Sequence, residues 1–144
     1  GKKVCGILTE MSAQFDYVNH IVVGIGINVQ NKSFPKDIES VATSLFIETK
    51  EHYHRAELVE RIWEAFEHYY EIFLQTEDLS GLVNEYNSHL VNMHQQVKVL
   101  DPKEPFEGKA MGITPKGELI VDTWESRKLV STGEVSVRGI YGYV

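Results

Sequence analysis

The sequence predicts an α+β protein, in which part of a mixed-sheet domain with helices is followed by a small β-barrel. Strand-like apolar runs occupy residues 4–9 and 17–29, and helical periodicity dominates residues 55–74. After about residue 92 the period changes to the alternation that is typical of short strands. We therefore expect one domain over residues 1–92 and a second over residues 93–144.

The two apolar runs are expected to form neighbouring central strands. The run over residues 17–29 has apolar side chains on both parities, which is typical of a strand covered on both faces. Residues 11–16 show no clear period and predict a loop that lets the two strands lie side by side. The relative direction of the strands stays open at this point.

Three helices are expected between these strands and the barrel. Phe34-Pro35 is typical of a helix start, and apolar residues follow on one helical face at positions 38, 41, 42 and 45. Residues 55–74 carry the strongest apolar stripe, whose aromatic side chains are expected to belong to the core. Asp78 is a suitable cap for a third helix, with apolar residues at positions 79, 82, 83, 86 and 90.

The last third of the chain predicts several short strands, whose close spacing indicates a small barrel. Turn-forming residues separate these strands at Asp101-Pro102, at residues 114–117 and at Thr132-Gly133. The expected strands cover residues 96–100, 106–113, 118–123, 127–130 and 134–138.

The composition disfavours several functional classes. The chain has 144 residues with 14 basic and 21 acidic side chains, and its net charge of −7 disfavours nonspecific binding to nucleic acid. No apolar stretch approaches the roughly 20 residues that cross a bilayer, so we expect no membrane span. Cys5 is the single cysteine and cannot form an internal disulfide, which fits a cytoplasmic protein. The chain starts at Gly1 without an initiating methionine, and we expect it to be the end of a longer protein.

The most unusual local feature is the segment GIGIN at residues 24–28. Two glycines near the end of an apolar strand remove side chains where something must approach the backbone. The segment is not a dinucleotide fingerprint, because Val29 stands where that motif needs a third glycine. A strand bulge or close strand packing explains the glycines equally well. Asn28 either orients a polar ligand or caps the following turn.

Lysine and arginine side chains supply two further candidates. Lys3 could present a point charge to a carboxylate or a phosphate, although a solvated side chain is the alternative. Glu134 and Arg138 share one strand parity, so they could face a ligand or a domain together, or simply pair with each other. The histidines, including His52 and His54, fall at no ligand spacing, and we expect no metal site formed by the protein.

Three segments of the sequence, taken in their order along the chain, resemble the C-terminal part of bacterial biotin protein ligases. They are KVCGILTE at residues 3–10, VVGIGINV at residues 22–29 and STGEVSVRG at residues 131–139. Phe34-Pro35 and the segment ATSL at residues 42–45 also match the family pattern, so the likeness spans nearly the whole chain. The resemblance implies the C-terminal part of a catalytic domain followed by a small SH3-like β-barrel.

The resemblance implies an enzyme that activates biotin with ATP to biotinyl-AMP. The biotin is then transferred to a lysine of a carboxylase carrier domain, such as that of acetyl-CoA carboxylase. Lys3 matches the lysine that contacts the reacting carboxyl group and the adenylate phosphate. The other residues implied to bind biotin are Gly6, Gly24, Gly26 and Ile27.

The nucleotide side and the partners are also implied by the resemblance. Lys3, Asn28, Ala42, Ser44 and Arg138 are expected to bind ATP or the adenylate, with Mg²⁺ carried mainly by the ATP phosphates. A homodimer through the catalytic sheet is expected, and DNA would be bound only through a domain upstream of this sequence.

One departure from the family limits these expectations. The family carries an arginine- and glycine-rich loop upstream of the lysine strand, and nothing in this sequence resembles it. We therefore expect these residues alone to be inactive. Two alternatives remain: a non-catalytic protein-binding module, and a ligase that is also a biotin-responsive transcriptional repressor. A lipoate-ligase-like activity fits the glycine segments less well.

Overall fold

The computed structural model describes residues 1–15, 17–101, 104–131 and 136–139. The chain divides into two compact units, Gly1–Glu60 and Arg61–Val144. This division does not coincide with the expected boundary near residue 92, which stays a prediction. Within the described residues, no helix combines the length and the apolar character needed to cross a membrane.

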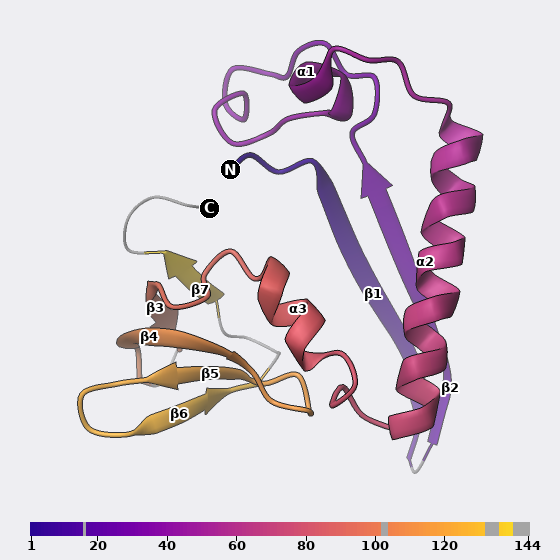
Figure 1. The fold of residues 1–144 in the computed structure, drawn as a ribbon. Helices are drawn as coiled ribbons and strands as arrows, with labels where there is room; N and C mark the ends of the chain where they lie inside the picture. Colours follow the sequence, from indigo (N-terminus) through magenta and orange to yellow (C-terminus); the bar gives the residue numbers. More distant parts are fainter. Residues whose placement is uncertain (16, 102–103, 132–135, 140–144) are drawn as a thin grey trace. The chain divides into compact units, whose positions relative to one another are not determined.

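A long antiparallel ribbon dominates the first unit (Figure 1). It pairs β1 (Cys5–Gln14) with β2 (Tyr17–Ile27), so the expected adjacency is confirmed and the direction is antiparallel. The loop expected over residues 11–16 is largely wrong, because the hydrogen-bonded ladder continues to Gln14. The expectation of strands covered on both faces is also wrong for the described residues, since nearly all residues of both strands are exposed.

The helix expected after Phe34-Pro35 is replaced by turns. Backbone bonds from Glu39 N and Ala42 N close two turns, and the chain then becomes extended at Ser44. The helix α1 begins only afterwards and covers Leu45–Thr49. The apolar spacing predicted a helix too early, because Val41 and Thr43 form backbone hydrogen bonds with Lys3, and these bonds end the turns.

The long helix α2 covers Arg55–Thr76 and confirms the strongest periodic signal of the sequence. Its aromatic stripe is stacked edge to face or face to face along the helix, from Trp63 through Phe66 and Tyr70 to Phe73. The expected placement of these aromatic side chains in the core is wrong among the described residues, since no residue of α2 is buried.

The third helix, α3, is shorter than expected and covers Val83–His89. Asp78 does not cap it: the carboxylate accepts the backbone N–H of Ser80 at 2.7 Å and closes a preceding turn. Hydrogen bonds from Ser80 hold the pKa of Asp78 below its ordinary value. Leu82 occupies the N-cap position instead.

Gly81 is required by packing in this turn. A Cβ placed on Gly81 would lie 2.6 Å from Cγ2 of Ile72 on α2. We expect Gly81→Ala to lower the free energy of unfolding by about 1–3 kcal/mol, the usual cost of overpacking. Chemical denaturation measures this loss, and Ile72→Ala is the control because it removes the clashing methyl group. If the effects of the two substitutions are additive in the double variant, the clash is not the cause.

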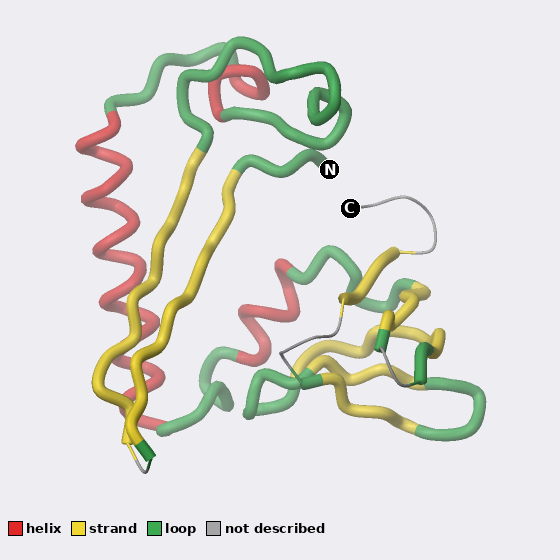
Figure 2. Tube along the Cα trace, turned by 180° about the vertical axis from the view of Figure 1, so that it is seen from behind, coloured by secondary structure: helices red, strands yellow, loops and turns green. Residues whose placement is uncertain are grey.

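The second unit ends in a five-stranded antiparallel sheet with the order β6-β5-β4-β3-β7. Figure 2 draws its strands in yellow. All the expected barrel strands are confirmed within a few residues of their expected bounds. A buried cluster of Val97, Val99, Ala110 and Val121 forms its core. The strands are β3 (Gln96–Leu100), β4 (Phe106–Ile113), β5 (Leu119–Asp122), β6 (Arg127–Val130) and β7 (Ser136–Gly139).

Among the described residues of this sheet, the turn at residues 114–117 forms where the turn-forming residues predicted it. Thr114 accepts the N–H of Gly117 at 2.9 Å, and Gly117 has a φ of +80°, which favours glycine. The hairpin of β5 and β6 is held by Arg127, which contacts both carboxylate oxygens of Asp122 and keeps the pKa of Asp122 below its ordinary value. Pro102, Thr132-Gly133 and Glu134 lie outside the described residues.

Candidate binding site around Lys3

A pocket of about 320 Å³ lies in the first unit, where the start of β1 and the end of β2 meet the turns that precede α1. Five of the expected site residues line this pocket: Lys3, Gly6, Gly26, Asn28 and Ala42. The others that line it are Cys5, Phe34, Ile38 and Val41.

Lys3 is placed by backbone hydrogen bonds on both of its sides. Its N–H donates to the carbonyl of Val41 at 2.7 Å, and its carbonyl accepts the N–H of Thr43 at 2.9 Å. The end of its side chain lies over Gly6, with Nζ 3.8 Å from the point where a Cβ would stand. Gly6 is paired with Gly26 across the ribbon. The ammonium group and the bare backbone of both glycines therefore belong to one pocket.

The glycines of this ribbon are not explained by the fold. Gly6, Gly24 and Gly26 are absent from the described residues with positive φ, and the ribbon's register shift lies elsewhere, between Ser12 and Ala13. A Cβ on Gly24 or Gly26 would meet its nearest atom at 3.7 or 3.8 Å, which is ordinary contact. Glycine in a strand weakens it. Within the described residues, a bulge and close packing are thus disfavoured as reasons for these glycines, and their expected contact with a ligand stays a prediction.

Gly24 lies beside the pocket rather than in it. It lines an adjacent shallow hollow along the ribbon together with Gly6, Gly26 and three aliphatic residues, Ile7, Leu8 and Ile25. Ile27, also an expected site residue, is half-buried at the end of β2 and lines neither hollow.

Asn28 is fixed by its main chain and its side chain. Its N–H donates to Val4, its carbonyl accepts from Leu45, and its Nδ2 donates to the carbonyl of Thr43 at 3.0 Å. Asn28 therefore ties the turn segment to the strand and lines the pocket, and its expected role toward a polar ligand stays a prediction.

Ser44 is placed differently from its expected nucleotide contact. Its side chain is fully buried, and its hydroxyl donates to the carbonyl of Asn31 at 2.6 Å. The same oxygen accepts the N–H of Ile47 at 3.0 Å, so Ser44 is the N-cap of α1. Its hydroxyl is therefore engaged within the protein.

Arg138 lies in the second unit, on β7, where its backbone is paired with Lys98. Its side chain lies outside the described part of the structure. Its expected contact with ATP or the carrier stays a prediction.

The sequence did not identify the apolar wall of the pocket. Phe34, Ile38 and Val41 form this wall, from a segment that was expected to be helical. The spacing of Ile38 and Val41 predicted one face of a short helix, whereas the turns place both residues in the lining of the pocket. Lys3 supplies the only charge among the described residues that line the pocket. The site thus combines one cation, exposed backbone and an apolar wall, which suits an anionic group attached to a ring.

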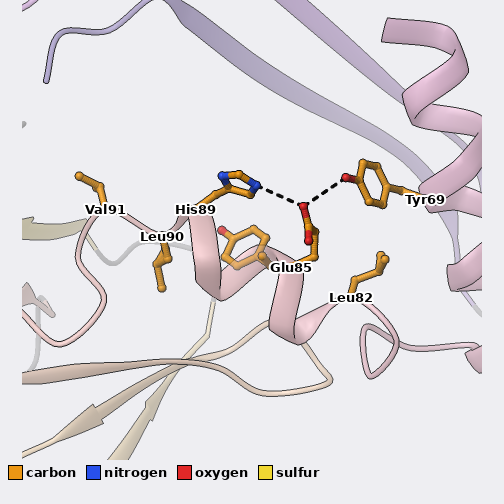
Figure 3. A pocket seen from close by; sticks show the side chains of 7 residues that line it. Tyr69, Leu82, Glu85, His89, Leu90 and Val91 are labelled. Carbon is orange, nitrogen blue, oxygen red and sulfur yellow. Dashed lines mark hydrogen bonds and ion pairs between the residues drawn. The ribbon is translucent and has the colours of Figure 1, made fainter. Parts of the chain in front are cut away.

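A second pocket, of about 480 Å³, lies between α2 and α3 in the second unit (Figure 3). Glu85 accepts a hydrogen bond from Tyr69 at 3.5 Å and lies 3.2 Å from Nε2 of His89. Both members of the Glu85–His89 pair are more than half exposed, and such pairs contribute at most about 1 kcal/mol. Three polar side chains of this pocket, Tyr69, Glu85 and His89, therefore engage one another.

Comparisons with known proteins point in one direction. Residues 95–138 match the family described as the biotin protein ligase C-terminal domain. The chain is 32% identical over 139 residues to the bifunctional ligase/repressor BirA of Bacillus spizizenii and to that of Bacillus subtilis. In each case the match covers 95% of this chain and 42% of the relative, so the chain spans less than half of their length.

Solved structures of a biotin protein ligase are also similar to this chain. The apo structure of biotin protein ligase from Aquifex aeolicus is similar with a TM-score of 0.82 and 28% identity, over 96% of this chain and 59% of that one. The same enzyme in complex with biotin and ATP is similar with a TM-score of 0.79 and 28% identity, over 96% of this chain and 56% of that one.

Proposed function

We propose that this chain, a BirA-like C-terminal portion of a biotin protein ligase, supplies the lysine- and glycine-lined part of the site that activates biotin. The proposed reaction joins biotin to ATP as biotinyl-AMP and passes biotin to a lysine of a carboxylase carrier domain. The observation that carries the proposal is the convergence of Lys3 with the bare backbone of Gly6 and Gly26 on one pocket.

The pocket suits the first step of this reaction. A biotin carboxylate oxygen attacks the α-phosphorus of ATP, and pyrophosphate leaves with its electron pair. Both reactants are anionic, so the Lys3 ammonium offsets their repulsion and stabilises the charge that develops on the phosphate. Gly6 and Gly26 let the fused rings of biotin lie against the backbone, and Gly24 and Ile27 are proposed to extend this contact.

The nucleotide side of the pocket is assigned to the turn segment. We place the adenylate beside Asn28 and Ala42, against the wall formed by Phe34, Ile38 and Val41. Ser44 contributes by holding α1, and Arg138 stays a proposed contact of ATP or the carrier. In the second step the neutral amine of the carrier lysine attacks the acyl carbon, AMP leaves with the electron pair of the broken C–O bond, and the nitrogen releases its proton to solvent.

Mg²⁺ enters this proposal only as part of the MgATP substrate. The described residues contain no group of three or more His, Cys, Asp or Glu side chains that could hold a metal ion. The described residues that line the Lys3 pocket also include no carboxylate. We propose that the ATP phosphates and water carry most of the Mg²⁺ coordination.

The test uses the full-length protein that contains this chain. It is incubated with biotin, MgATP and a biotin carrier domain, and mass spectrometry follows biotinyl-AMP and the mass of the carrier. We expect both products. Folded protein that forms neither would refute the proposed function and favour a non-catalytic binding module. Calorimetry with biotinyl-AMP separates these two alternatives independently, since a non-catalytic module has no site for it.

We expect residues 1–144 alone not to form biotinyl-AMP. Lys3 is the only cation that lines the described pocket, so it leaves most of the charge of a triphosphate unneutralised. Mass spectrometry of the isolated chain with biotin and MgATP checks this expectation. Product above the level of a heat-denatured control would show that residues outside this sequence are dispensable.

A repressor function is a second candidate, because the curated relatives are named bifunctional ligase/repressor. The net charge of −7 disfavours DNA contact by these residues themselves. We propose that any DNA contact of the full-length protein lies outside this sequence, that its location is cytoplasmic and that it forms a homodimer.

A further inference from the structure

Thr43 joins the two segments that bring polar groups to the Lys3 pocket, although its own side chain does not line that pocket. Its backbone N–H donates to the carbonyl of Lys3 at 2.9 Å. Its backbone carbonyl accepts from Nδ2 of Asn28 at 3.0 Å. One residue is therefore bonded to both Lys3 and Asn28, and its position affects both.

The side chain of Thr43 anchors this backbone. Thr43 is 3% exposed, and its hydroxyl donates to Oε1 of Glu48 in α1. A buried hydroxyl without a partner is costly, so this bond favours one placement of the segment. Ser44 fixes the start of the same helix as its N-cap. The backbone at Thr43 is thus tied to α1 on one side and to the pocket residues on the other.

We propose that Thr43 is a positioning residue of the activation site. Its hydroxyl, held by Glu48, fixes the backbone that sets the Lys3 ammonium and the Asn28 amide for the nucleotide. The inference rests on the proposed function, because it assigns Lys3 and Asn28 to ATP. Thr43 touches no substrate in this proposal. It acts by holding the two groups proposed to bind the nucleotide in the geometry that binding needs.

The test compares two substitutions in the full-length protein. Thr43→Val keeps the shape of the side chain and removes the hydroxyl, and we expect the KM for ATP to rise about tenfold while the KM for the carrier domain stays unchanged. Thr43→Ser keeps the hydroxyl, and we expect it to stay within about twofold of the unchanged protein. A purely structural role would reduce the active fraction, and hence kcat, without moving the KM for ATP.

Thr49→Val is the matched control on the same helix. Its hydroxyl donates to the carbonyl of Leu45 at 2.9 Å and has no bond to the pocket segments. We expect this variant to keep both KM values. A rise in the KM for ATP equal to that of Thr43→Val would overturn the inference, because loss of any hydroxyl near α1 would then suffice.

The outcomes separate the inference from the function on which it rests. If the unchanged protein forms no biotinyl-AMP, the proposed function fails and the inference fails with it. If the unchanged protein is active but Thr43→Val keeps its KM for ATP, only the inference fails. If Thr43→Val does not fold, Glu48→Ala tests the inference instead. This substitution removes the carboxylate that accepts the Thr43 hydrogen bond, and Glu48 is exposed, so the fold should tolerate its loss. We expect it to raise the KM for ATP about threefold, and an unchanged KM would overturn the inference.

Discussion

Replacing Lys3 by alanine in the full-length protein is expected to slow biotinyl-AMP formation by about 100- to 1,000-fold, the range found when one preorganised charge-stabilising group is lost. The ammonium group is the only charge that the described residues bring to the pocket. The fold is expected to persist, because Lys3 is tied to Val41 and Thr43 through its backbone. Rapid-quench measurement of biotinyl-AMP gives the rate, and thermal melting tests the fold.

Lys2→Ala is the matched control for this prediction. Lys2 precedes Lys3, is exposed and donates through Nζ to the carbonyl of Glu39 at 2.9 Å, but it does not line the pocket. We expect its rate to stay within about twofold of the unchanged protein, as for most surface substitutions. If both variants lose activity equally, general positive charge at the start of the chain is responsible. If Lys3→Ala keeps its activity, Lys3 has no part in the chemistry.

Local patterns predicted those parts of the fold that local contacts determine. The barrel strands alternate in burial, as in β3 with its buried Val97 and Val99, and residues with strong turn preferences end them. The stripe of α2 also gave its start at Arg55. Residues 11–14 were missed because they lack the valine, isoleucine and leucine that mark the strand before them, and only the pairing with β2 shows that the strand continues to Gln14.

Contacts between distant segments explain the errors. The spacing of Ile38 and Val41 is helical, but backbone hydrogen bonds of Val41 and Thr43 to Lys3 end the turns. Lys3 lies about forty residues earlier in the chain, so a local pattern does not contain this information. The turns then give the pocket its apolar wall, which no local pattern identifies. The same long-range bonds place Thr43, whose importance is invisible without the fold.

The site was predicted by resemblance more than by residue chemistry. Glycines and a lone lysine left strand packing and solvated charge as alternatives. The structure adds that Gly6 and Gly26 face each other in the ribbon and that Lys3 lies over Gly6. The role of each residue toward a ligand stays a prediction.

Gly26→Ala tests whether a ligand explains the glycines of the ribbon. The backbone at Gly26 is not in the left-handed region, and an added Cβ would meet its nearest atom, the carbonyl oxygen of Gly6, at 3.8 Å. We therefore expect the free energy of unfolding to rise by about 0.4–1 kcal/mol, since alanine restricts the unfolded chain. The same methyl group enters the pocket, where it is expected to crowd bound biotin at a cost of about 1–3 kcal/mol. This cost corresponds to a Kd for biotin that is roughly 5- to 150-fold higher.

Gly108→Ala is the matched control, and we expect it to affect stability but not the binding of biotin. A Cβ on Gly108 would lie 2.6 Å from the carbonyl oxygen of Asp122 and 2.7 Å from Cγ1 of Val121, so this glycine is required by the packing of β4 against β5. We expect about 1–3 kcal/mol lower stability and an unchanged Kd for biotin below the melting temperature. Chemical denaturation and calorimetry of the full-length variants give the two quantities. If Gly26→Ala is destabilised and still binds biotin normally, its glycine serves the fold, and the ligand assignment of the ribbon is wrong.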